Sequence, residues 1–231
     1  FQSLFGFGQK TGVELPGESG GLLPTPGKLH PNGRPEWSLS TPYSLAMGHN
    51  ILVNSLQIAK AYALFANGGL AVEPHLVRKI VKGQPDGSRK ILVDRTSWRA
   101  SKRVLSPSVV QPIVRGLKFV TKDGGTSKRA DIAGYTEAGK SGTSEKIVAG
   151  SYSDQHYISS FVGFAPASRP RFVLLVSVDE PEVGWIPSVG KQHHGGIAAA
   201  PIFREIATRS LQYLGVAPDD PHGYPPGDPR R

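Results

Sequence analysis

Ala138-Gly139-Lys140-Ser141-Gly142-Thr143 is the stretch of this 231-residue sequence on which the choice of fold depends. From Gly134 to Ser141 the sequence fits the phosphate-loop pattern G-x-x-x-x-G-K-[ST], which requires a buried strand directly before the loop and a helix directly after it. Only a short, polar run precedes Gly134, and Gly142-Thr143-Ser144 is a poor start for a helix. We therefore expect this stretch to be a strand, and a phosphate-loop nucleotide hydrolase is the alternative interpretation.

The residues that follow predict two further strands, at 157–165 and 171–179, joined by a short turn at 166–170. The run from Phe172 to Val178 is apolar almost throughout, which is typical of a strand that is covered on both faces. A connection this short joins antiparallel strands. The strands after residue 137 therefore predict one antiparallel sheet.

Helices are predicted in three places: residues 55–66, from Ser106-Pro107 onwards, and about 197–214. The first has Asn54 as its N-cap and Gln57 three residues later, which is the spacing of a capping box. Pro112 lies inside the second helix and should bend it or delay its start.

A β-hairpin is predicted between the first two helices, because β-rich runs at 75–82 and 89–94 flank the turn-forming residues 84–87. The order along the chain is then loops, helix, hairpin, helix, three strands and helix. Helices and strands do not alternate, and short turns join the strands. The fold class is therefore α+β, with an antiparallel sheet flanked by helices.

The two ends of the chain differ from the middle. Residues 1–42 are rich in Gly and Pro without a helical or strand period, so we expect an extended, loop-rich segment that lies on a core built elsewhere. Residues 216–231 carry five prolines, and we expect a Pro-rich, disordered tail after a domain that spans 1–215. The start at Phe1 also leads us to expect a part of a longer protein.

The composition excludes several classes. With 27 Lys and Arg against 18 Asp and Glu the net charge is +9, which favours anionic partners. Nucleic acid is disfavoured, because basic residues form no long run and do not interleave with aromatic residues. The lack of Cys excludes disulfide scaffolds, thiol nucleophiles and cysteine-ligated zinc. The sequence contains neither an apolar stretch of about 18 residues nor a signal-peptide pattern.

Five segments carry recognisable motifs, and they lie at residues 5–12 with 15–18, 56–69, 138–143, 161–166 and 195–203. In this order they resemble the C-terminal part of the transpeptidase domain of class B penicillin-binding proteins. The third segment matches the family motif that is usually Lys-Thr-Gly-Thr, and Ser141 replaces its first Thr while keeping the hydroxyl. The resemblance covers nearly the whole chain, and five motifs in the right order make it specific.

The resemblance implies the serine β-lactamase and D,D-peptidase fold, here incomplete, and a peptidoglycan D,D-transpeptidase activity. In that reaction a serine attacks a D-alanyl-D-alanine stem peptide, and β-lactams acylate the same serine. The resemblance makes Lys140 catalytic, together with the backbone N–H of Thr143 as an oxyanion donor. It assigns substrate binding to Ser141, Gly142, Thr143 and Ser144. Neither a cofactor nor a metal ion takes part.

The same resemblance implies the partners and the location. The partners are peptidoglycan stem peptides, β-lactam antibiotics, the cell-wall synthesis machinery and the upstream half of the same domain. The location is the periplasmic face of a bacterial inner membrane, through an anchor outside this chain. A role in elongation and a role in division are both left open.

Two of the three catalytic motifs of the family are not in this sequence. The nucleophile motif Ser-x-x-Lys matches only Ser188 to Lys191, which comes after the Lys140 segment rather than before it, and Ser-x-Asn has no match. We therefore expect the nucleophile to lie upstream and this chain alone to be inactive. A non-catalytic relative that binds cell-wall peptide is a further alternative. His193-His194 are interpreted as loop contacts and not as metal ligands.

Overall fold

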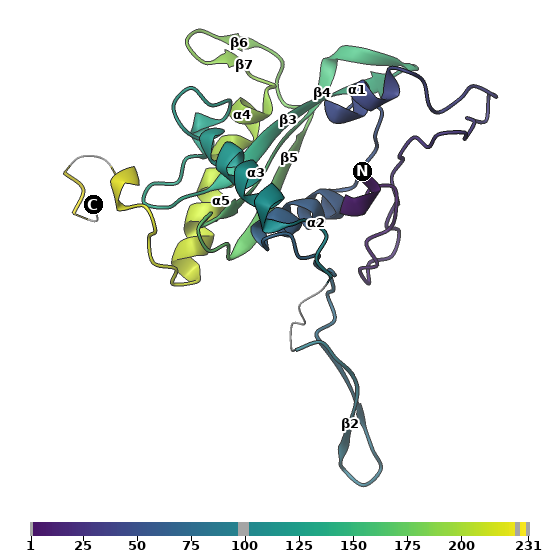
Figure 1. Ribbon diagram of the computed structural model, residues 1–231. Helices are drawn as coiled ribbons and strands as arrows, with labels where there is room; N and C mark the ends of the chain where they lie inside the picture. The colour runs from purple at the N-terminus through teal and green to yellow at the C-terminus, as the bar shows by residue number, and fades with distance from the viewer. Residues whose placement is uncertain (1, 97–101, 225–226, 230–231) are drawn as a thin grey trace. The chain divides into compact units, whose positions relative to one another are not determined.

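The computed structural model describes residues 2–96, 102–224 and 227–229, drawn as a coloured ribbon in Figure 1. The chain divides into two compact units, Phe1–Ala61 with Ala71–Val104, and Tyr62–Leu70 with Leu105–Arg231. The first unit holds η1 (Gln2–Phe5), α1 (Thr41–Ala46), the first part of α2 (Ser55–Ala66), β1 (Lys79–Gly83) and β2 (Arg89–Asp94). The second holds α3 (Pro107–Phe119), η2 (Lys128–Ala130), β3 (Ala138–Val148), β4 (Ser151–Ala165), β5 (Phe172–Asp179), β6 (Trp185–Ile186), β7 (Gly190–Lys191), α4 (Gly195–Ala198), α5 (Ala200–Tyr213) and η3 (Pro221–Gly223).

The loop-rich N-terminal segment is held by the first turn of α2. The buried side chain of Gln57 donates from Nε2 to the carbonyl oxygens of Gln9 at 2.7 Å and Gly20 at 2.8 Å. The predicted capping box is confirmed, because Asn54 Oδ1 accepts the N–H of Gln57 at 2.8 Å and Gln57 Oε1 accepts the N–H of Asn54 at 2.9 Å. Gln57 therefore caps the helix and fastens two loops at once. The short helix α1 is not expected from the sequence.

Strands β1 and β2 form the predicted hairpin as a two-stranded antiparallel sheet of their own, although β1 begins at Lys79 and not at residue 75. Glu14 holds the base of the hairpin. Its Oε2 accepts the N–H of Leu76 at 2.9 Å, and its Oε1 forms an ion pair with Arg95. These contacts, the bond from Leu76 above all, lower the pKa of Glu14 to about 2.

The second unit is built on an antiparallel sheet with the strand order β3-β4-β5, so β3 is an edge strand. Helix α5 packs on one face through Phe203, whose ring centroid lies 4.7 Å from that of Phe161 on β4. Helix α3 lies beside β3 on the other face (Figure 1). Val162 and Phe164, which alternate with Phe161, are buried as well. A sheet flanked by helices on both faces confirms the predicted α+β fold.

Several predicted bounds differ from the structure. Strand β4 begins at Ser151 and not at residue 157, because β3 and β4 continue as a hairpin beyond the end of β5. The predicted helix 197–214 is two helices, and Pro201 lies in the first turn of the second, where a proline favours a new start. Pro112 lies within α3 and does not delay its start at Pro107. In the described part of the chain, no helix combines the length and the apolar character needed to cross a membrane.

Residues 216–224, for which we expect no structure, fold back onto the turn before β3. Asp219 accepts the N–H of Thr136 at 2.7 Å and also the hydroxyls of Thr136 and Ser168. Tyr224 is 4% exposed and packs so closely on Gly134 that a Cβ there would lie 1.9 Å from its ring. A hydrophobic period cannot reveal such contacts, because one carboxylate and one aromatic ring make most of them.

Candidate functional site

The segment 138–144 is extended, as predicted, and forms the first part of edge strand β3. The register with β4 pairs Lys140, Ser141, Gly142 and Thr143 with Val162, Phe161, Ser160 and Ser159. Because side chains alternate along a strand, Ser141 and Thr143 face the side of α4 and α5, whereas Lys140 and Ser144 start from the opposite side. Among the residues that the structure describes, the edge of β3 away from β4 has no strand partner, and such an edge can pair with an extended peptide.

Three hydroxyl groups gather on one side of β3. Thr126 Oγ1 lies 3.3 Å from Ser141 Oγ, and Thr143 Oγ1 accepts the N–H of Gly195 at 3.0 Å. A hydroxyl has one hydrogen and two lone pairs, so the bond from Gly195 leaves the hydrogen of Thr143 free to donate. The side of β3 that faces α4 is therefore lined with potential donors.

Lys140 adds positive charge to these hydroxyls. The side chain is exposed, and its Nζ donates to the carbonyl oxygen of Ser141 at 2.9 Å and lies 3.5 Å from Ser141 Oγ. Asp179 and Glu180, at the end of β5, pair with Lys146 at 2.9 and 2.6 Å. A cation beside hydroxyl donors, not neutralised by these two carboxylates, is suited to bind an incoming carboxylate.

Two glycines at the start of α4 keep the helix against β3. A Cβ on Gly195 would lie 2.3 Å from the carbonyl oxygens of Gly142 and Ser160. A Cβ on Gly196 would lie 2.1 Å from the carbonyl oxygen of Thr126. Any other residue would push α4 away, so the glycines hold Thr126 and the N–H of Gly195 in place beside the strand.

His193, two residues before α4, supports this junction by packing. Its ring stacks on Tyr157 with centroids 4.0 Å apart and planes 9° from parallel, and its carbonyl oxygen accepts the hydroxyl of Ser159. The side chain is 6% exposed, and its Nδ1 has no hydrogen-bond partner within the ranges 2–96, 102–224 and 227–229. Burial, with smaller effects of His194 and Lys191, lowers the pKa of His193, which favours the neutral ring at pH 7. Among the described residues, no group of three His, Asp or Glu side chains could hold a metal ion.

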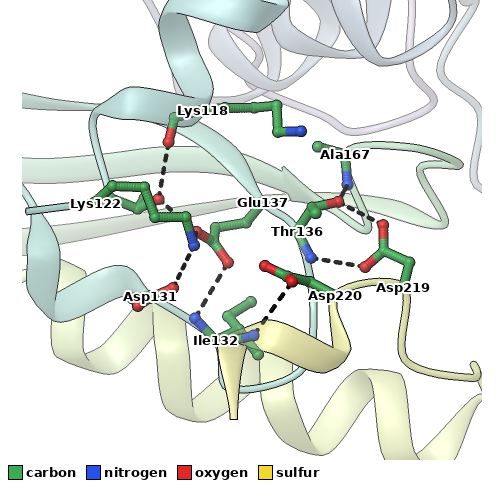
Figure 2. A network of polar contacts seen from close by, with 11 residues as sticks. Lys118, Lys122, Asp131, Ile132, Thr136, Glu137, Ala167, Asp219 and Asp220 are labelled. Carbon is green, nitrogen blue, oxygen red and sulfur yellow. Dashed lines mark hydrogen bonds and ion pairs between the residues drawn. The ribbon is translucent and has the colours of Figure 1, made fainter. Parts of the chain in front are cut away.

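A buried polar network fixes the residue that directly precedes β3. Glu137 is 1% exposed, accepts the N–H of Ile132 at 3.1 Å and the hydroxyl of Thr121, and forms an ion pair with Lys122 at 3.1 Å (Figure 2). Lys122 also binds Asp131 at 2.6 Å. Burial raises the pKa of Glu137, and the bond from Thr121 and the charge of Lys122 oppose this rise. The network ties the end of α3 and the preceding turn to the root of β3.

The structure brings Lys140, Ser141 and Thr143 together around Gly142, whereas Ser144 lies on the other face and donates to the carbonyl oxygen of the next residue at 3.4 Å. Thr126 and Gly195 join this group without being expected as site residues from the sequence. Thr126 follows a Gly-Gly pair that signals a tight turn, but no sequence signal places that turn beside Ser141.

The structure also decides two of the other interpretations. The residues after Gly139 form a strand where a phosphate loop requires a helix, so the nucleotide-hydrolase alternative is wrong. Ser188 has a φ of 64° in the turn between β6 and β7, not at the start of a helix, which agrees with its rejection as the nucleophile.

The family model described as penicillin binding protein transpeptidase domain matches residues 2–208. The chain is 35% identical over 214 residues to stage V sporulation protein D of Bacillus subtilis, covering 93% of this chain and 30% of that protein. It is 33% identical over 216 residues to the probable peptidoglycan D,D-transpeptidase PbpC of Pseudomonas aeruginosa, covering 93% and 33%. The crystal structure of penicillin-binding protein 3 from Mycobacterium tuberculosis with ampicillin matches at a TM-score of 0.73 and 32% identity, covering 98% of this chain and 47% of that one. This chain thus spans about a third of the length of both curated relatives.

Proposed function

Since this chain belongs to the family of penicillin-binding protein transpeptidase domains, we propose that it forms the donor-binding part of a peptidoglycan D,D-transpeptidase. The observation that carries the proposal is the charge of Lys140 beside the hydroxyls of Ser141 and Thr143 on an edge strand. The Pseudomonas aeruginosa relative is named a probable peptidoglycan D,D-transpeptidase, and the mycobacterial relative binds ampicillin, which supports the same assignment.

The donor binds as an extended peptide along the open edge of β3. Its terminal carboxylate accepts hydrogen bonds from the hydroxyls of Ser141 and Thr143 and lies within the field of Lys140. The bond from Gly195 to Thr143 orients the hydroxyl so that its hydrogen points away from α4. Gly142 lets the peptide backbone approach the strand closely. Ser144 contributes less to binding of the carboxylate in this proposal, because its side chain starts from the other face.

The reaction is acyl transfer through an acyl-serine. A serine oxygen attacks the carbonyl carbon of the penultimate D-alanine, and the N–H of Thr143 donates to the oxyanion that forms. The C–N bond then breaks, terminal D-alanine leaves with a proton relayed through Lys140, and the amine of a second stem peptide displaces the serine. Removing one oxyanion donor lowers the rate by about 10²–10³. The scheme requires neither metal nor cofactor.

The nucleophile and its base come, in this proposal, from a part of the protein outside these 231 residues. The only Ser-x-x-Lys match here is the turn at Ser188, and Ser-x-Asn has no match. The same serine would be the one that β-lactams acylate. We further propose that the protein acts with the cell-wall synthesis machinery on the periplasmic face of a bacterial inner membrane, where its substrate is found.

Labelling of the full-length protein with fluorescent penicillin tests this proposal. We expect a stoichiometric adduct, and Lys140→Ala should slow its formation by about 10²-fold or more, because both carboxylate binding and proton transfer suffer. Ser188→Ala is the matched control and should label like the wild type.

The isolated chain 1–231 should form no adduct. A stoichiometric adduct on that chain, or loss of labelling in Ser188→Ala, would show that the nucleophile lies within these residues. A full-length protein that neither labels nor contains Ser-x-x-Lys would instead be a non-catalytic cell-wall-binding relative.

A further inference from the structure

The β1–β2 hairpin of the first unit leaves nearly all its side chains uncovered. Every residue of β1 and all but one of β2 are exposed, and four aliphatic side chains, Ile80, Val81, Ile91 and Leu92, are 42, 43, 51 and 52% exposed. Within the described part of the chain, the two strands pair only with each other, so neither outer edge of the hairpin has a strand partner there (Figure 1). A lone two-stranded hairpin is marginally stable in water at best. A partner that covers these side chains or pairs with an open edge would therefore stabilise the hairpin.

The charges along the hairpin indicate the chemistry of that partner. Lys82 and Lys90 stand directly opposite each other in the register, and like charges in this position destabilise a strand pair. The acidic side chains near them are already engaged. Asp94 pairs with Lys79 at 3.6 Å, and Asp86 accepts the N–H of the turn residue Ser88 at 2.9 Å. In the described part of the chain, neither Lys82 nor Lys90 has a salt-bridge partner.

We propose that the hairpin binds an extended acidic segment of a partner protein. The segment adds as a third strand along one edge and places Asp or Glu carboxylates beside Lys82 and Lys90. Backbone hydrogen bonds then satisfy an open edge, the carboxylates relieve the lysine–lysine repulsion, and apolar residues between them cover the exposed aliphatic side chains. The bonds of Glu14 to Leu76 and Arg95 fix the base of the hairpin, so the edge is formed before binding.

Two simpler explanations account for fewer features of the hairpin. Lysines on edge strands discourage aggregation, but this role requires neither a facing pair nor four exposed aliphatic side chains. An anionic membrane surface would match the charge, but it offers no strand to the open edges. Residues 76–96 also contain no Trp, Tyr or Phe, the residues enriched at membrane interfaces.

The test uses the full-length protein and a short fluorescent peptide in which Glu alternates with Val. Fluorescence anisotropy at physiological ionic strength should show saturable binding, and hydrogen exchange of the amides in 79–94 should slow. The double variant Lys82→Glu with Lys90→Glu should weaken binding by about tenfold or more. It keeps a like-charged pair, so the stability of the hairpin itself is matched to the wild type.

Two controls separate strand addition from plain charge attraction. Arg169→Glu with Arg171→Glu makes the same change in net charge at exposed positions of the second unit and should alter binding by no more than about twofold. A peptide with the same sequence but N-methyl groups at alternate residues keeps the charges, cannot donate along one edge, and should not bind.

Equal binding of the two peptides, or equal losses in the two double variants, would overturn the proposal in favour of non-specific attraction. Binding to phosphatidylglycerol vesicles that depends on Lys82 and Lys90, without peptide binding, would identify a membrane surface instead. Absence of binding to both probes would overturn it as well.

Discussion

The substitution Glu137→Ala removes three interactions at the root of β3: the ion pair with Lys122 and the acceptors for Thr121 and for the N–H of Ile132. Leaving one charge of a buried pair unpaired costs about 3–5 kcal/mol. Most of that cost does not apply to Lys122, because its side chain is 35% exposed and its ion pair with Asp131 at 2.6 Å remains. The larger loss is the buried N–H of Ile132, about 1–3 kcal/mol, with the cavity added to it. We expect the free energy of unfolding to fall by about 3 kcal/mol.

The substitution Glu137→Gln should cost only about 1 kcal/mol, since its amide oxygen can still accept the N–H of Ile132. Burial also raises the pKa of Glu137, so a neutral side chain is tolerated at this position. Urea unfolding followed by circular dichroism measures both changes. Glu145→Ala, at an exposed position of the same strand, is the control and should stay within about 0.5 kcal/mol of the wild type. A Glu137→Ala protein as stable as that control, or a Gln variant as unstable as the Ala variant, would refute this account of the network.

Three further substitutions or conditions test other parts of the fold. Asn54→Ala should lower the free energy of unfolding by about 1 kcal/mol in urea unfolding, because α2 loses its side-chain cap, and Asn54→Ser, which keeps an acceptor for the N–H of Gln57, should restore part of it. Gly195→Ala should lower the free energy of unfolding by about 1–3 kcal/mol, because the new Cβ would lie 2.3 Å from the carbonyl oxygen of Gly142, and an unchanged melting temperature would contradict the tight packing of α4. The pKa of Glu14 is lowered from 4.5 to about 2, so its contribution is full above pH 4.5 and is lost as the pH falls through about 2. Exchange of the Leu76 amide, corrected for its intrinsic rate, should therefore speed up in that window, and Glu14→Ala, which removes the acceptor, should show fast exchange already at neutral pH.

Features with a local cause could be predicted from the sequence. Asn54 and Gln57 are three residues apart, so the capping box depends only on the first turn of α2. The apolar run of β5 and the short turn before it were enough to place an antiparallel sheet. The extended conformation of 138–144 could be predicted because the flanking residues exclude a phosphate loop. The run before Gly134 is too short and polar for a buried strand, and the residues after Ser141 are a poor start for a helix.

Features that depend on contacts between distant residues could not be predicted. Thr143 and Gly195 are 52 positions apart, and neither has a neighbour that signals their hydrogen bond. The far halves of β3 and β4 are mostly polar and exposed, so no buried face marks their extension past β5. Glu137 is a charged residue in a position that most sequence patterns assign to solvent, and only the network around Lys122 explains its burial.

The contact of Asp219 with Thr136 has a practical consequence for anyone who engineers this protein. A purification tag or reporter fused directly after α5 would displace the residues that brace the turn in front of β3. The turn in front of β3 would then lose the acceptor for the N–H of Thr136, and the start of β3 would be held less firmly. Fusions joined beyond Tyr224 preserve that brace, so truncation sites for expression should be chosen there.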